Sequence, residues 1–88
     1  MDRREVTLSE LLRLEQEGGS LVGELRRRFG FTRREAEVAM LLIARHGNAE
    51  IAERLHISQH TARHHVQKVL QKLGVSSRRQ ARNKLLTD

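Results

Sequence analysis

The strongest pattern in this 88-residue chain is a single apolar stripe along residues 59–73. Its members recur at the three- and four-residue spacing of an α-helix: Ala62, Val66, Val69, Leu70 and Leu73. The positions between them carry basic or hydrogen-bonding side chains. No segment of the chain alternates with period two over any length, so no strand is predicted. The stripe and the lack of alternation together predict an all-α protein.

Residues that favour helix starts and ends divide the rest of the chain. Three pairs have the spacing of a capping box, in which each side chain bonds the other residue's backbone N–H: Thr7 and Glu10, Thr32 and Glu35, Ser77 and Gln80. Asn48 and Ser58 are good single N-caps. Glycines suited to helix ends stand at positions 18, 19, 30, 47 and 74. These signals predict helices over 8–17, 21–29, 33–46, 49–55, 59–73 and 78–86.

The composition excludes several classes of protein. The chain contains no Cys, which removes disulfides, thiol catalysis and Cys-based zinc sites. No apolar run approaches the roughly 18 residues that a membrane-spanning helix needs, and no signal peptide is recognisable. We therefore expect a small cytoplasmic domain with no membrane partner. No paired carboxylates, phosphate loop or activated nucleophile is present, so the chain is predicted not to be an enzyme and to need no cofactor.

The net charge of +6 is concentrated in one part of the chain. Acidic and basic residues balance over 1–30 and again over 31–57, whereas 58–87 carries seven Lys or Arg and no acid. This segment also holds His60, His64 and His65. Because no acid or Cys accompanies the histidines, no metal site is predicted. The excess of positive charge instead predicts a polyanionic partner.

Residues 48–65 have the organisation of a helix-turn-helix. A short helix with apolar Ile51, Ala52 and Leu55 is followed by a turn over 56–58 and by the helix that Ser58 caps. In this arrangement the second helix is free to enter the major groove of DNA. Its outer face is rich in donors and free of acids, which strengthens the interpretation.

Four motifs then resemble the LuxR-type (GerE-like) DNA-binding domain: FTRREAEV at 31–38, NAEIAERL at 48–55, ISQHTARHH at 57–65 and KLGV at 72–75. The resemblance runs without a gap over about 31–81. It implies a four-helix domain over 31–88 whose third helix reads DNA. Residues 1–30 are extra to that domain, and we expect one or two short helices there, forming a linker or a dimerisation segment.

The resemblance also implies the residues that touch DNA. Arg63, His64 and Gln67 would contact bases, and the backbone would be contacted by Asn48, Ser58, Thr61, His65 and Lys68. The residue types agree with these roles. Arg can donate two hydrogen bonds to guanine and Gln can pair with adenine, while Lys, Thr and His donate to phosphate.

Two departures from the family pattern affect the predicted site. The family usually has Gly at the position of Arg45 and a small hydroxyl residue at that of Gly47. We therefore expect a differently shaped loop before Asn48, with Gly47 taking over the special backbone conformation. Ala49 stands where the family usually has Lys, which removes one expected phosphate contact.

The predicted function is that of a bacterial transcription regulator. It would bind double-stranded DNA as a homodimer on a pseudo-palindromic site, with RNA polymerase as a further candidate partner. Two alternatives remain open. One is a promoter-binding module similar to sigma-factor region 4, in which EIAERL and IS-x-x-T also occur. The other is an interaction module that keeps the fold without binding DNA.

Overall fold

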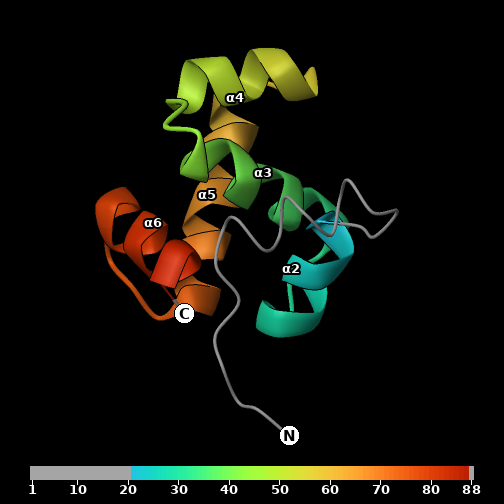
Figure 1. Ribbon diagram of the computed structural model, residues 1–88. Coiled ribbons are helices and arrows are strands. Elements are labelled where there is room, and N and C mark those ends of the chain that lie inside the picture. Colours follow the sequence, from blue (N-terminus) through green and yellow to red (C-terminus); the bar gives the residue numbers. More distant parts are fainter. Residues whose placement is uncertain (1–20, 88) are drawn as a thin grey trace, which may run out of the picture.

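A computed structural model describes residues 21–87, which form five α-helices and no strand (Figure 1). The helices are α2 (Leu21–Phe29), α3 (Arg33–Ile43), α4 (Asn48–Leu55), α5 (Gln59–Leu73) and α6 (Arg78–Thr87). The all-α prediction is confirmed. The predicted helix over 8–17 and the predicted box of Thr7 and Glu10 lie outside the described residues.

Helix α3 lies at the centre of the packing. It contacts α2, α5 and α6, while α4 packs on α5 (Figure 1). Four of the five predicted stripe residues on α5 are buried: Ala62, Val66, Val69 and Leu73. Leu70 is half-buried at the edge of the same core. Leu21 and Leu25 of α2 belong to this core as well, so α2 packs together with the four helices that follow it.

The end of α3 differs from the prediction. The helix stops at Ile43 instead of residue 46, and Arg45 adopts a left-handed φ of 68°. Two backbone bonds close the last turn there, from Arg45 N to Leu42 O and from His46 N to Leu41 O, both 3.0 Å. This pairing is the Schellman motif, which requires a left-handed residue directly after the helix whatever its type.

Gly47 therefore does not take the special conformation that we predicted for it. Its φ of −83° and ψ of 178° are extended, as the residue before a helix requires. Gly47 is the N-cap of α4, and Asn48 is the first helical residue instead of the cap. The prediction was wrong because glycine fits either role, so its presence does not show which residue adopts a positive φ.

The other predicted helix starts are formed as expected at two of three places. Thr32 and Glu35 make both bonds of a capping box at α3, at 3.1 and 2.9 Å. The Ser58 Oγ accepts from Thr61 N at 3.0 Å and caps α5. Each of these bonds joins residues three positions apart, which explains why local spacing predicts them.

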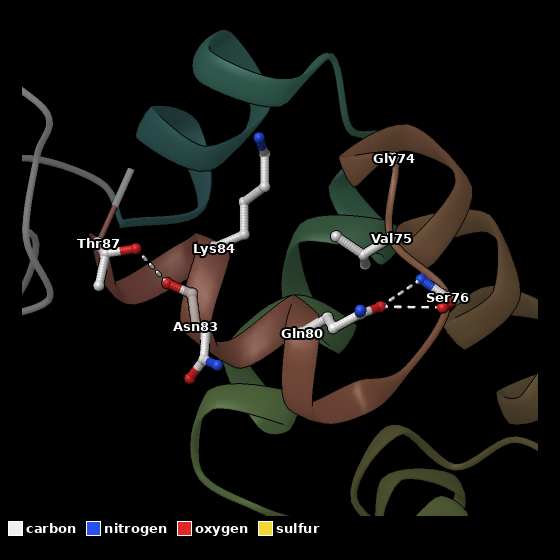
Figure 2. Close-up of a pocket in the computed structure, with 7 residues that line it drawn as sticks. All are labelled: Gly74, Val75, Ser76, Gln80, Asn83, Lys84 and Thr87. Atoms are coloured by element: carbon white, nitrogen blue, oxygen red, sulfur yellow. Dashed lines mark hydrogen bonds between the residues drawn. The ribbon is translucent and has the colours of Figure 1, made fainter.

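The predicted box at α6 is only half formed. Gln80 N donates to Ser77 Oγ at 3.1 Å, but the Gln80 side chain does not return a bond to Ser77. Its Oε1 accepts instead from both N and Oγ of Ser76, each at 2.9 Å (Figure 2). The amide therefore fixes the residue before the N-cap and holds the chain between Gly74 and α6.

A partly buried ion pair connects α3 with the far end of α5. Lys72 Nζ donates to Glu35 Oε1 at 2.7 Å and to the Gly30 carbonyl oxygen at 2.9 Å. The Glu35 side chain is only 8% exposed. Burial raises the pKa of Glu35, but the hydrogen bonds from Lys72 and Thr32 lower it by more. The net pKa is below its usual value, so Glu35 is held as a carboxylate.

Candidate nucleic-acid interface

Helices α4 and α5 meet at a tight turn that contains no glycine. His56 adopts φ 58° and ψ 45° directly after α4. Ile57 N donates to Ala52 O at 2.9 Å and His56 N to Glu53 O at 3.3 Å. Ile51 and Ala52 are buried, and α4 packs on α5. The predicted helix-turn-helix geometry is therefore present in the structure.

The outer face of α5 carries the three residues predicted to contact bases. Arg63, His64 and Gln67 are all exposed. Within residues 21–87, none of the three forms a side-chain hydrogen bond or an ion pair. The His64 ring lies 6.4 Å from the His65 ring, in an edge-on arrangement. The donors of this face are therefore available to a ligand.

The residues predicted to contact the DNA backbone lie at both ends and along one edge of this face. Lys68 is exposed, and Thr61 and His65 are half-buried. Ser58 donates from Oγ to Thr61 Oγ1 at 2.9 Å while accepting from Thr61 N. The Ser58 proton is thus in use, which leaves the Thr61 hydroxyl proton free to donate to another oxygen.

The remaining predicted residue, Asn48, stands on α4 and has a partner from α6. Arg78 donates from Nη2 to Asn48 Oδ1 and from Nη1 to the His46 carbonyl oxygen, the latter at 3.3 Å. Burial, with a smaller effect of the nearby Arg82 charge, lowers the pKa of Arg78. Sequence reasoning placed Arg78 only within a basic helix, because no local pattern relates residues 30 positions apart.

Glu50 makes two contacts at the start of α4, with the Gly47 backbone and with the His46 side chain. Glu50 Oε1 accepts from Gly47 N at 3.2 Å and lies 3.3 Å from His46 Nδ1. The Gly47 bond, and then the His46 bond, lower the pKa of Glu50. Glu50 therefore stays ionised, and its carboxylate is hydrogen-bonded at the start of α4, where a negative charge suits the helix dipole.

Charge on α5 itself is of one sign. The helix contains Arg63, Lys68 and Lys72 but no acidic residue. Among the described residues, only Lys72 of these three bonds to other protein groups, namely the Glu35 carboxylate and the Gly30 carbonyl oxygen. The positive charge near the turn is therefore not neutralised by the helix that carries it, which favours a polyanion at this surface.

A hollow of the described region lies elsewhere, at the end of α5 away from the turn. It has a volume of about 630 Å³ and is lined by Gly74, Val75, Ser76, Gln80, Asn83, Lys84 and Thr87 (Figure 2). These residues include no carboxylate and no histidine, so they offer no acid–base pair. Over residues 21–87 no cluster of His, Asp or Glu could hold a metal ion. No helix of that part is long and apolar enough to cross a membrane.

Comparison with known proteins agrees with this geometry. The model of the family described as bacterial regulatory proteins, luxR family, matches residues 30–84. The chain belongs to the luxR family. The matched residues include the helix-turn-helix and every residue predicted to contact DNA, and the resemblance inferred from the four motifs is confirmed. The family is one of regulators, in agreement with the prediction that the chain is not an enzyme.

Two relatives give the extent of the similarity to luxR-family proteins. The chain is 47% identical over 55 residues to the spore germination protein GerE of Bacillus subtilis strain 168, covering 62% of this chain and 74% of that protein. It is 46% identical over 50 residues to the transcriptional regulatory protein DegU of Brevibacillus brevis, covering 57% of this chain. The match spans only 21% of DegU. No solved structure matches the chain.

Proposed function

We propose that this chain binds double-stranded DNA in a sequence-specific manner, as the DNA-binding part of a bacterial transcription regulator. The observation that supports this most directly is the outer face of α5, where Arg63, His64 and Gln67 are exposed and form no side-chain hydrogen bond or ion pair within residues 21–87. An exposed charged or amide group with no partner contributes little to stability. Such a set on an acid-free helix is better explained by a ligand that accepts hydrogen bonds.

The dimensions of α5 suit the major groove. An α-helix with its side chains is about 10–12 Å in diameter and the groove is about 12 Å wide, and the 15 residues of α5 span about 22 Å along the helix axis. With α5 in the groove, Arg63 and Gln67 would donate to base edges, with His64 beside them. Thr61, His65 and Lys68 would face the sugar–phosphate backbone, and the helix starts at Asn48 and Ser58 would approach phosphates.

We further propose that the chain acts as a homodimer. A two-fold dimer of helix-turn-helix units reads two half-sites about one helical turn apart, roughly 34–36 Å, so the site would be pseudo-palindromic. RNA polymerase is the expected partner of a regulator bound in this way. Residues 1–30 are proposed as an extension that contributes to dimerisation, and 31–88 as the DNA-binding domain.

Selection of bound duplexes from a random DNA pool tests this function. The expected result is a motif of two related half-sites, whose spacing reports the symmetry of the bound protein. No enrichment and no gel shift at low salt would contradict DNA binding and would favour a protein-interaction module on the same fold.

Substitution of Arg63 then tests the assigned base contact. Arg63→Ala should cost about 1–3 kcal/mol on the selected site and relax the preference at one base pair, because a base-specific hydrogen-bond pair is lost. Lys68→Ala is the matched control, since it removes the same charge from the same face. It should weaken binding uniformly across sequences. An unchanged sequence preference in Arg63→Ala would show that another residue reads the bases.

A further inference from the structure

The side chain of Asn48 is held by a residue from a distant part of the chain. Arg78, the first residue of α6, donates to Asn48 Oδ1 through Nη2. It also donates through Nη1 to the carbonyl oxygen of His46, at 3.3 Å. One half-buried guanidinium therefore fixes both the loop before α4 and the first side chain of α4.

The chemistry of the guanidinium determines which end of the Asn48 amide faces it. An arginine side chain has five N–H donors and no acceptor, so only the amide oxygen can accept from it. The amide NH₂ group must then point away from Arg78. This orientation follows from the donor inventory and does not depend on telling nitrogen from oxygen in the amide.

Within residues 21–87 the NH₂ group of Asn48 has no protein partner. In that part of the chain it donates to no side chain or backbone oxygen. No buried side-chain nitrogen or oxygen in that part lacks a hydrogen-bond partner. The unpaired nitrogen of Asn48 therefore reaches the surface, at the start of the helix that precedes the turn.

We infer that Arg78 is a positioning residue for DNA binding: by occupying the Asn48 oxygen, it presents the Asn48 NH₂ group to a backbone phosphate. The inference rests on the proposed function. An amide without this partner could equally turn its oxygen toward the phosphate, and two acceptors would then face each other. Arg78 acts here through Asn48, since its own guanidinium is half-buried and engaged with two protein oxygens.

A double-mutant cycle on DNA binding tests the inference. Affinity for a random-sequence duplex is measured over a series of salt concentrations for the wild type, Asn48→Ala, Arg78→Ala and the double variant. Each single variant should bind about two- to tenfold more weakly, the range expected for one hydrogen bond. The double variant should bind as Asn48→Ala does, because both changes remove the same phosphate contact.

Two further variants separate positioning from charge and from folding. Arg79→Ala removes the same charge from the neighbouring exposed position of α6 without touching Asn48, and it should weaken binding less than Arg78→Ala. Arg78→Lys keeps the charge but cannot donate to both oxygens in the same geometry. It should also bind more weakly than the wild type, and it serves if Arg78→Ala does not fold, as judged by chemical denaturation.

The outcomes distinguish this inference from the function on which it rests. Failure of the wild type to bind any duplex at low salt would overturn both. If the wild type binds DNA but the losses of affinity in Asn48→Ala and Arg78→Ala multiply in the double variant, the inference alone is overturned. The same holds if Arg78→Lys binds as the wild type does, because the effect would then be one of charge.

Discussion

The starts of α3 and α4 are held by distant side chains in addition to their own first turns, whereas the start of α5 is held by its own first turn alone among the described residues. Lys72 reaches Glu35 across 37 positions of sequence, and Arg78 reaches Asn48 across 30. Within residues 21–87 the Ser58 side chain bonds only to Thr61, three positions along. Among the described residues, no side chain from another helix bonds to the start of α5.

This difference separates the cations that hold the fold from those left for a ligand. Lys72 and Arg78 spend their donors on carboxylate, amide and carbonyl oxygens inside the protein. Arg63 and Lys68, on the first three turns of α5, form no side-chain hydrogen bond or ion pair with any residue of 21–87. A helix fixed by its own cap and by its apolar stripe can keep its whole outer face unused. The same fold therefore builds a rigid support and an open binding face from similar residue types.

Removing the contact between Lys72 and Glu35, which are the furthest apart in sequence, should lower the stability of the protein most. Lys72→Met takes away the cationic partner of Glu35 and leaves a carboxylate whose side chain is 8% exposed and which still accepts from Thr32 N. The free energy of unfolding at pH 7 should fall by about 1.5–3 kcal/mol, the range for a hydrogen bond to a charged group. Urea denaturation measures the change. Lys68→Met removes an exposed lysine from the same helix and should shift the free energy by less than about 0.5 kcal/mol.

The pH dependence of the same variant checks the cause. The pKa of Glu35 in the folded wild type is below its ordinary value of 4.5. The stabilisation it contributes is therefore complete above pH 4.5 and is lost as the pH falls through the folded pKa. Without Lys72 the folded pKa rises, so the difference between variant and wild type should shrink in acid. A difference that is constant from pH 7 to pH 3 would contradict a role for this ion pair.

The comparison also marks what the sequence could predict. The α5 stripe, the Thr32 box and the Ser58 cap depend on spacings of three or four residues, and the structure has them where they were expected. The hydrogen bonds from Lys72 to Glu35 and from Arg78 to Asn48 depend on how α5 and α6 pack, and no local sequence pattern predicts that packing. The end of α3 was missed for a related reason. Apolar residues continue to Ala44, but the helix is terminated by backbone bonds to Leu41 and Leu42.

In the candidate site, too, the sequence predicted what depends on local spacing and missed what depends on contacts between distant residues. The family motifs led to Arg63, Gln67 and Lys68, and the structure places all three on the exposed face of α5. Asn48 was expected as a helix cap and proves to be the first helical residue, with its oxygen already occupied. Its partner Arg78 was hidden among the basic residues of the last helix. Local spacing identifies side chains that project from one helix, but not a side chain that orients another.

The local cap of α5 offers a smaller perturbation. Ser58→Ala removes the acceptor of Thr61 N and the donor to Thr61 Oγ1. The free energy of unfolding should fall by about 1 kcal/mol, as for other N-cap residues. Thermal or urea denaturation measures this loss, with Gln59→Ala as a control at the next, exposed position. A loss no larger than in the control would mean that the start of α5 is held by something other than its cap.

The smallest expected effect concerns the turn itself. His56 and Arg45 both occupy left-handed conformations, at φ 58° and 68°. A residue with a Cβ atom pays about 1–2 kcal/mol there, while glycine in that position costs up to about 1 kcal/mol more in unfolded-chain entropy. His56→Gly and Arg45→Gly should therefore each raise the free energy of unfolding, by roughly 0.5–1 kcal/mol. Differential unfolding in urea resolves changes of this size.

Gly74 provides the reverse experiment, because it occupies the same position after α5 at φ 73°. Gly74→Ala should destabilise the protein, and no neighbouring atom within 4 Å of the added Cβ would confuse strain with a clash. If His56→Gly raises the free energy of unfolding and Gly74→Ala lowers it, the left-handed backbone conformation is the cause of both changes. If His56→Gly and Arg45→Gly raise the free energy of unfolding by equal amounts, the hydrogen bonds from Arg78 do not relieve backbone strain in the loop before α4. The effect of Arg78 would then lie in the orientation of Asn48, on which the proposed phosphate contact depends. If only His56→Gly raises the free energy of unfolding, the loop that Arg78 bonds to has offset the strain at Arg45.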